Sequence, residues 1–154
     1  EIRVDFLRII HDLIPHYDVV LLDTGAGISD VVLFAISLAT DVLVVATPEP
    51  TSLTDAYATI KVLATTQGRR DLRLLVNQVG RPGDGRNIRG QLQQVVDRYV
   101  TPGLDSPVKL EFLGEVASDK SVREAVTRRQ LLLDLFPGTP AAQGVIAAAT
   151  RLNS

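Results

Sequence analysis

Apolar residues along the chain follow two spacings, which separate predicted helices from predicted strands. Between residues 2 and 13 they recur on one face of a helix, whereas residues 19–22 form a continuous run typical of a strand covered on both faces. A similar run at 42–47 predicts a second buried strand. The predicted helices are 2–13, about 30–39, 52–67, 87–99 and 140–152, with another opened by Ser121. The predicted strands are 18–23, 42–47, 72–77 and 108–113.

Several residues are well suited to begin these helices, and the order of elements predicts the fold class. Pro140 fits the first turn of the last helix, and the strand at 108–113 alternates apolar with polar residues, which favours a place near an edge. Strands alternating with helices predict an α/β fold with a mostly parallel sheet flanked by helices. The candidate helix caps are Ser29, a box of Ser52 with Asp55, and a box of Ser121 with Glu124.

An acidic residue ends the first predicted strand and is followed by a glycine turn. Asp23 comes directly after the apolar run, and Gly25 and Gly27 follow it. Ligands of open α/β sheets bind outside the carboxyl ends of the strands. A carboxylate can hold a metal-bound water there, and bare backbone amides can approach a phosphate. The pattern indicates a Mg-nucleotide site, and the alternative is that Asp23 caps the next helix.

The amino-acid sequences of several segments resemble those of a known family. Residues 17–29 read Tyr-Asp-Val-Val-Leu-Leu-Asp-Thr-Gly-Ala-Gly-Ile-Ser, and 47–52 read Thr-Pro-Glu-Pro-Thr-Ser. Further along the chain, 74–78 read Leu-Leu-Val-Asn-Gln and 110–114 read Leu-Glu-Phe-Leu-Gly. In this order they resemble the MinD/ParA class of deviant-Walker ATPases, which are P-loop NTPases of the SIMIBI type. Within that class they are most similar to the flagellar-number regulators FlhG, also called FleN or YlxH.

The phosphate-binding loop of that family is missing from the sequence. The lysines are Lys61, Lys109 and Lys120, and none stands in a Gly-Lys-Ser/Thr motif. We therefore expect residues 1–154 to be the C-terminal portion of a MinD/FlhG-like ATPase domain, downstream of the phosphate loop and inactive by itself. The resemblance places the missing strand between those ending at Asp23 and Thr47, so its absence predicts unpaired strand edges.

The resemblance also implies roles for residues at the strand ends. Asp23 would be the catalytic acid that holds Mg²⁺ through water. Asn77 would read the adenine of ATP, because its amide offers one donor and one acceptor; alternatively it caps the loop that follows. Gly80 stands where guanine-specific relatives carry an aspartate, which favours adenine. The residues implied to sense the γ-phosphate are Thr24, Gly25, Ala26 and Gly27.

The resemblance implies roles for two further sets of residues. Asp119 aligns with a nucleotide-binding aspartate, although Ala117 and Ser118 replace the usual proline and glutamate, and its alternative role is to begin a helix. The surface for the dimer or a partner would include Glu49, Thr54 and Asp55. The alternative for that set is a cap at Asp55 and a solvated acid at Glu49.

Composition narrows the possible partners and location. The net charge is −2, so the sequence gives no bulk reason to bind nucleic acid or anionic lipid, and no direct nucleic-acid contact is expected. There is no cysteine, which excludes disulfides and thiolate metal sites. A cytoplasmic protein is expected, with transient contact to the inner face of the membrane through a tail. Residues 141–154 are alanine-rich and nearly uncharged, so no basic amphipathic anchor is evident there.

The resemblance implies a nucleotide-dependent switch that controls flagellar assembly or number. ATP would drive dimerisation of the full-length protein and would be hydrolysed by it. The implied partners are flagellar proteins such as the SRP-type GTPase FlhF or a flagellar transcription activator. One alternative is a non-catalytic pseudo-ATPase adaptor that binds proteins. Another is a phosphoacceptor receiver domain, but that domain needs an acidic pair and a strand-end lysine that the sequence does not supply.

Overall fold

The computed structural model describes residues 2–152, with side chains from residue 4 onward. It contains two compact units, residues 1–39 and 40–154. Residues 153 and 154 of the expected tail lie outside the described part. None of the helices within residues 2–152 combines the length and the apolar composition that a membrane-spanning helix requires.

The first unit consists of helices joined by an extended segment. Helix α1 (Ile2–Leu13) is followed by the 3₁₀ turn η1 (Ile14–His16), and α2 covers Asp30–Leu38. The rings of Phe6 and Phe34, one from each helix, lie 6.3 Å apart between centroids. Ser29 caps α2 as predicted, because its hydroxyl accepts from the Val32 amide at 3.4 Å.

The predicted strand at 18–23 does not form. Residues 17–29 contain no strand, and Val19 and Leu21 are 52% and 77% exposed. A strand requires a neighbour to satisfy its backbone N–H and C=O groups. The sequence lacks the phosphate-loop strand that the family resemblance places beside this segment. Apolar character is present at 18–23, but within residues 2–152 the segment has no strand to pair with.

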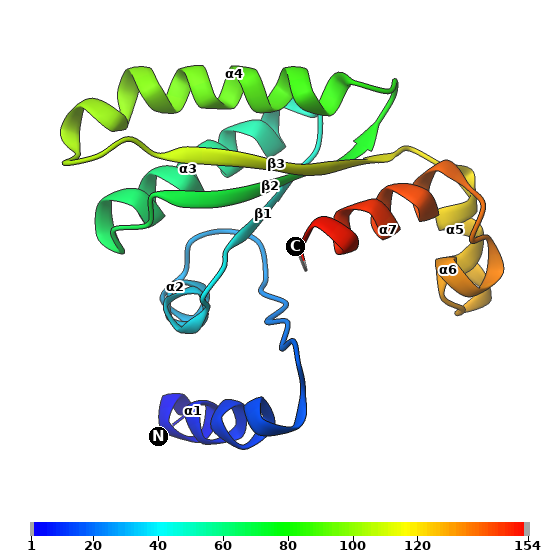
Figure 1. Cartoon of the computed structure of the whole chain (residues 1–154), viewed down its shortest axis with the longest axis horizontal. Helices are drawn as coiled ribbons and strands as arrows, with labels where there is room; N and C mark the ends of the chain where they lie inside the picture. The colour runs from blue at the N-terminus through cyan, green and yellow to red at the C-terminus, as the bar shows by residue number, and fades with distance from the viewer. Residues whose placement is uncertain (1, 153–154) are drawn as a thin grey trace. The chain divides into compact units, whose positions relative to one another are not determined.

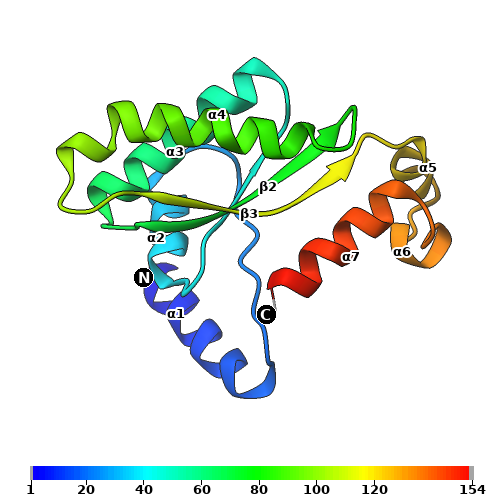
Figure 2. The same cartoon turned by 45° about the horizontal axis from the view of Figure 1, so that its top comes forward.

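A parallel three-stranded sheet forms the centre of the second unit, as the fold prediction required. Its order is β1 (Leu43–Ala46), β2 (Asp71–Val79), β3 (Lys109–Ala117), so β3 lies at an edge as predicted. Helices α3 (Pro50–Thr66) and α4 (Asp84–Tyr99) cover one face, and α7 (Pro140–Leu152) crosses β3 on the other (Figures 1 and 2).

Burial alternates along the strands because the two faces are covered differently. Leu74 and Val76 of β2 are completely buried, whereas Leu75 points to the side of α7 and is half-buried. In β1, Leu43 and Val45 are 39% and 54% exposed. The prediction that this second strand is fully buried is therefore wrong for one of its faces.

Several element boundaries differ from the predictions because other groups act as caps. Helix α3 begins at Pro50, so the box of Ser52 with Asp55 lies inside it, and the Ser52 hydroxyl accepts from the Thr47 amide at 2.9 Å. Helix α5 (Lys120–Arg128) is capped by Asp119, so the box of Ser121 with Glu124 is also wrong. The elements that the sequence did not predict are the 3₁₀ turns η1 and η2 (Thr101–Gly103) and helix α6 (Leu132–Leu135).

Side chains of α4 bind the outer edge of β3. The Gln93 amide donates to the Val108 carbonyl at 2.8 Å, and its oxygen accepts from the Leu110 amide at 2.8 Å. The Arg89 guanidinium donates to the Leu110 carbonyl at 2.7 Å. These backbone groups point away from β2, so α4 satisfies hydrogen bonds that a fourth strand would otherwise make.

Small residues allow α7 to lie very close to β3. Ala141, Ala142 and Ala148 are buried, and Gly144 packs directly against the β3 backbone. An added Cβ at Gly144 would lie 2.6 Å from the Glu115 carbonyl oxygen. The contact depends on the absence of a side chain at Gly144.

Two arginines at the amino-terminal end of the sheet join separate elements. Arg73 of β2 pairs with Asp41 at 3.3 Å and with Glu111 at 3.7 Å, and it donates to the Leu152 carbonyl at 3.0 Å. These contacts connect β2 to β3, to the segment just before β1 and to the end of α7. The Asp41 and Glu111 side chains are 60% and 64% exposed, so solvent screens both ion pairs and each contributes little to stability by itself.

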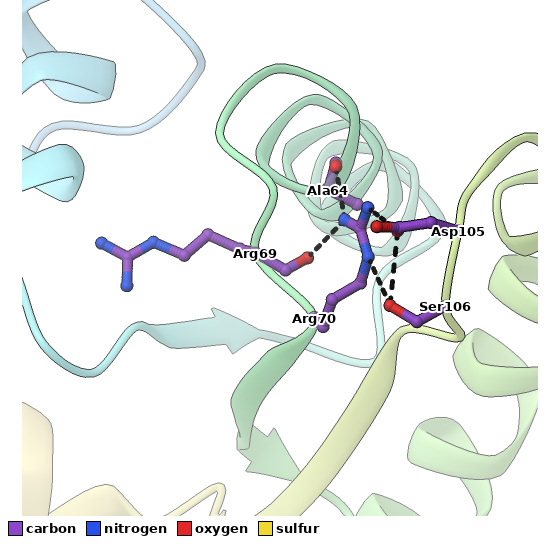
Figure 3. A network of polar contacts seen from close by, with 5 residues as sticks. All are labelled: Ala64, Arg69, Arg70, Asp105 and Ser106. Atoms are coloured by element: carbon purple, nitrogen blue, oxygen red, sulfur yellow. Dashed lines mark hydrogen bonds and ion pairs between the residues drawn. The ribbon is translucent and has the colours of Figure 1, made fainter.

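Arg70 connects the end of α3 to the segment before β3 (Figure 3). Its guanidinium contacts the Asp105 carboxylate at 2.7 Å and the Ser106 hydroxyl at 3.2 Å. It also donates to the Ala64 carbonyl at 2.7 Å, in the last turn of α3, where carbonyls have no intrahelical partner. The hydrogen bond and charge of Arg70 lower the pKa of Asp105 below its ordinary value.

We predict that Gly144→Ala lowers the free energy of unfolding, although alanine favours helices. The new methyl group would clash with the β3 backbone, a change that typically costs about 1–3 kcal/mol. Gly90→Ala is the matched control, because Gly90 also lies within a helix and has nothing within 4 Å of its Cβ position. The free energy of unfolding of the Gly90→Ala control should rise by up to about 1 kcal/mol. Urea denaturation followed by circular dichroism measures both, and equal gains would contradict the close packing of α7.

We predict that the Arg70–Asp105 pair contributes stability that depends on pH. The pKa of Asp105 is lowered in the folded chain, so this contribution is present above the ordinary aspartate pKa and is lost as pH falls through the folded value. Asp105→Asn should be less stable than wild type at neutral pH, with a difference that shrinks in acid. Asp55→Asn serves as the control, since Asp55 is exposed and makes no hydrogen bond or ion pair among residues 2–152. A constant difference across the pH range for Asp105→Asn would refute the mechanism.

Candidate functional site

The segment 23–27 lies in the first unit, in the extended stretch that leads into α2. All of its residues are exposed, and Gly27 has a φ of 94°, a conformation that suits glycine. The space around the Cβ positions of Gly25 and Gly27 is open to at least 4 Å. Since Ser29 caps α2, the alternative role of Asp23 as the helix cap is wrong. The carboxylate and the glycine amides are accessible to a ligand.

Asn77 lies in an irregular part of β2, close to the carboxyl end of that strand. The register with β3 shifts between Val76 and Val79, and Gln78 has a φ of 59°, uncommon for a residue with a side chain. The Asn77 side-chain oxygen accepts from the Gln78 amide at 2.9 Å. Within residues 2–152, the Asn77 NH₂ group makes no hydrogen bond. Asn77 thus caps the loop that follows it, which was the alternative to a contact with adenine. The N–H donors of its side-chain amide remain available to a ligand.

Glu115 fixes the loop that follows Asn77, a role that the sequence analysis missed. Its two carboxylate oxygens accept from the amides of Gly83 at 2.7 Å and Gly85 at 2.8 Å. Gly83 occupies the cap position of α4 and has no side chain to provide the cap. The neighbouring strand supplies it instead, and the negative charge is favourable at a helix amino terminus. No local sequence pattern signals this role, because the hydrogen bonds join residues 32 and 30 positions apart.

Asp119 joins the amino termini of two helices. One carboxylate oxygen accepts from the Ser121 amide at 2.9 Å in α5, and the other accepts from the Ala141 amide at 3.3 Å in α7. The hydrogen bonds from Ser121, and then that from Ala141, lower its pKa. These contacts confirm the alternative role of Asp119, which is to begin a helix. The Ser118 amide bonds the Val79 carbonyl at 2.9 Å, which places this segment beside the end of β2.

The residues predicted for a dimer or partner surface lie at the start of α3. Glu49 occupies the cap position without a side-chain hydrogen bond, and the Thr54 hydroxyl donates to the Pro50 carbonyl at 3.0 Å. Asp55 is exposed within the helix, so its alternative role as a cap is wrong. Nearby, the buried Thr47 hydroxyl oxygen has no hydrogen-bond partner in the described part of the chain. A bound ligand or a water molecule would supply that partner.

The chemistry of the segment 23–27 fits a magnesium nucleotide better than a metal held by protein alone. No group of three or more acidic, histidine or cysteine residues gathers within residues 2–152. Mg²⁺ commonly keeps several waters and is bound through one or two carboxylates together with substrate phosphates. A single accessible carboxylate at Asp23, beside open glycine amides, fits that pattern.

The chain is similar to two curated flagellar regulators. It is 37% identical over 143 residues to the antiactivator FleN of Pseudomonas aeruginosa, covering 93% of this chain and 49% of that protein. It is 28% identical over 137 residues to the flagellum site-determining protein YlxH of Helicobacter pylori, covering 89% of this chain and 44% of that protein. The chain spans about half the length of these relatives. No protein-family model matches it.

Solved structures of MinD proteins share its fold. A chain of the MinC:MinD cell division protein complex of Aquifex aeolicus matches with a TM-score of 0.71 and 25% identity, covering 98% of this chain and 57% of that chain. The septum site-determining protein MinD of Pyrococcus horikoshii, complexed with Mg-ADP, matches with a TM-score of 0.68 and 24% identity, covering 96% and 55%. The parallel sheet, the ordered sequence motifs and these likenesses agree: the chain belongs to the MinD/ParA family.

Proposed function

We propose that the chain is part of a nucleotide-dependent switch that regulates flagellar assembly or number. The observation that carries this proposal is the 37% identity to the antiactivator FleN across nearly the whole chain. Residues 1–154 would be the C-terminal portion of the ATPase domain. The full-length protein would dimerise with ATP and act in the cytoplasm, with transient attachment at the inner face of the membrane.

Each candidate residue has a defined task in this proposal. Asp23 would hold Mg²⁺ through water, and the residues that follow it, Thr24 to Gly27, would respond to the γ-phosphate. The available NH₂ donors of Asn77 support a contact with adenine. Mg-ATP would supply the phosphoryl group and the charge that the switch senses. Asp119 would affect the contact of Asn77 with adenine mainly by fixing the segment beside β2, because its oxygens already bind two helix amino termini.

Partners are proposed on the same basis. Glu49, Thr54 and Asp55 are exposed together at the start of α3 and would contribute to the surface for a second subunit or a flagellar protein. FlhF and a flagellar transcription activator are the two kinds of partner considered. The alternative is a pseudo-ATPase adaptor that binds proteins without nucleotide. A Gly-Lys-Gly-Gly-x-Gly-Lys-Ser/Thr segment in the coding sequence upstream of residue 1 would eliminate the adaptor.

We predict that the chain by itself binds Mg-ATP weakly or not at all, because it has no lysine and glycine loop for the β- and γ-phosphates. Calorimetric titration measures this affinity, and a micromolar value would contradict the expectation.

In the full-length protein, Asp23→Ala should abolish ATP turnover and leave folding unchanged, since the side chain is exposed. Asp18→Ala, an exposed acid in the same segment, is the control and should keep turnover. Wild-type turnover in Asp23→Ala would remove Asp23 from the site.

We also predict that the full-length protein prefers ATP to GTP. Replacing Gln78 with Lys and Gly80 with Asp should shift the preference toward GTP by about 1–3 kcal/mol, the scale of one or two buried hydrogen bonds. The structure leaves room at Gly80, where nothing lies within 4 Å of the Cβ position. A Gly80→Asn variant with the same lysine tests whether the carboxylate is responsible. Competitive nucleotide binding measures the preference, and equal affinities in the unmodified protein would rule out base reading by Asn77.

A further inference from the structure

Apolar side chains are exposed on helix α5, on helix α6 and at Leu131, the residue that precedes α6. Val126 and Leu131 are each 71% exposed, and Val122 and Leu133 are 38% and 40% exposed. Val122 and Val126 are four positions apart on α5, so they share one face of that helix. Helix α6 follows after a short turn and packs against α5 (Figures 1 and 2). These four residues define the α5–α6 surface.

Basic side chains accompany this surface. Lys120, Arg123 and Arg129 are exposed, and within residues 2–152 none of them forms an ion pair. Arg128 is already engaged, since it pairs with Glu124 and its guanidinium lies 5.9 Å from the centre of the Phe136 ring. The chain as a whole has a net charge of −2, so this positive charge is local to α5.

We propose that the α5–α6 surface docks an acidic amphipathic helix of a partner protein. Apolar side chains of such a helix would cover the exposed valines and leucines, and its carboxylates would face Arg123, Arg129 and Lys120. Removing the apolar groups from water favours the complex, and opposite charges fix its orientation and speed the encounter. The proposal requires no nucleotide and does not depend on the function proposed above.

Other occupants fit the observations less well. A second copy of the same surface would bring like charges together. An anionic membrane is disfavoured because α5 has nine residues and α6 has four, whereas interfacial helices are commonly longer and carry aromatic anchors.

The test begins with a displayed library of random peptides selected on the purified chain. It is counter-selected on a double variant, Val126→Ser with Arg123→Glu, whose folding is verified by circular dichroism. We expect the enriched peptides to be acidic and amphipathic with helical spacing. A fluorescently labelled enriched peptide should bind wild type, and each single substitution should weaken binding about tenfold or more. Added salt should also weaken it.

Matched substitutions on α4 provide the control. Val95 is 39% exposed and Arg98 is also on the surface, so Val95→Ser and Arg98→Glu should leave peptide binding unchanged. The proposal is overturned if no peptide survives counter-selection, or if the survivors are not acidic. It is also overturned if vesicles rich in phosphatidylserine bind the surface in place of peptides. Sedimentation that shows self-association abolished by Val126→Ser would assign the surface to a second copy.

Discussion

Hydrogen bonding along β2 is the interaction on which the unit of residues 40–152 depends. This strand pairs in parallel with β1 on one side and with β3 on the other, so it fixes both their directions and their registers. Helices α3 and α4 can cover one face together because both connect parallel neighbours. The same requirement explains the extended segment 17–29. Its apolar residues are suited to a sheet, but none of the described strands pairs with it.

Where strand pairing ends, side chains take over the backbone groups. Leu113 lies at a register shift, and its carbonyl accepts from the Arg151 guanidinium at 2.8 Å. Glu115 performs the complementary task for the amides at the start of α4. Asp119 does the same for two helices at once. Acidic residues near the end of β3 therefore hold the loops around Asn77, so a nucleotide contact there would be shaped by residues that need not touch the ligand.

The sequence predicted the longer helices and three of the four predicted strands formed, because apolar spacing records which face of a segment is buried; the four-residue helix α6 was not predicted. It could not predict the state of 18–23, because burial potential is local whereas pairing depends on a neighbour elsewhere in the chain. The caps at Ser52 and Ser121 were wrong for a related reason: Pro50 and Asp119 begin those helices earlier. The role of Glu115 depends on contacts across more than 25 residues, which no local pattern contains.

The contacts of Gln93 and Arg89 with β3 also determine how the sheet could be extended. The Gln93 side-chain amide donates to the Val108 carbonyl and accepts from the Leu110 amide, the same two kinds of hydrogen bond that a neighbouring strand would make. Along this stretch, recruitment of a strand from another molecule would first have to displace α4 side chains. The sheet is thus protected on one side against fibre-like growth. An added strand would meet less resistance at the opposite edge of the sheet, which β1 forms.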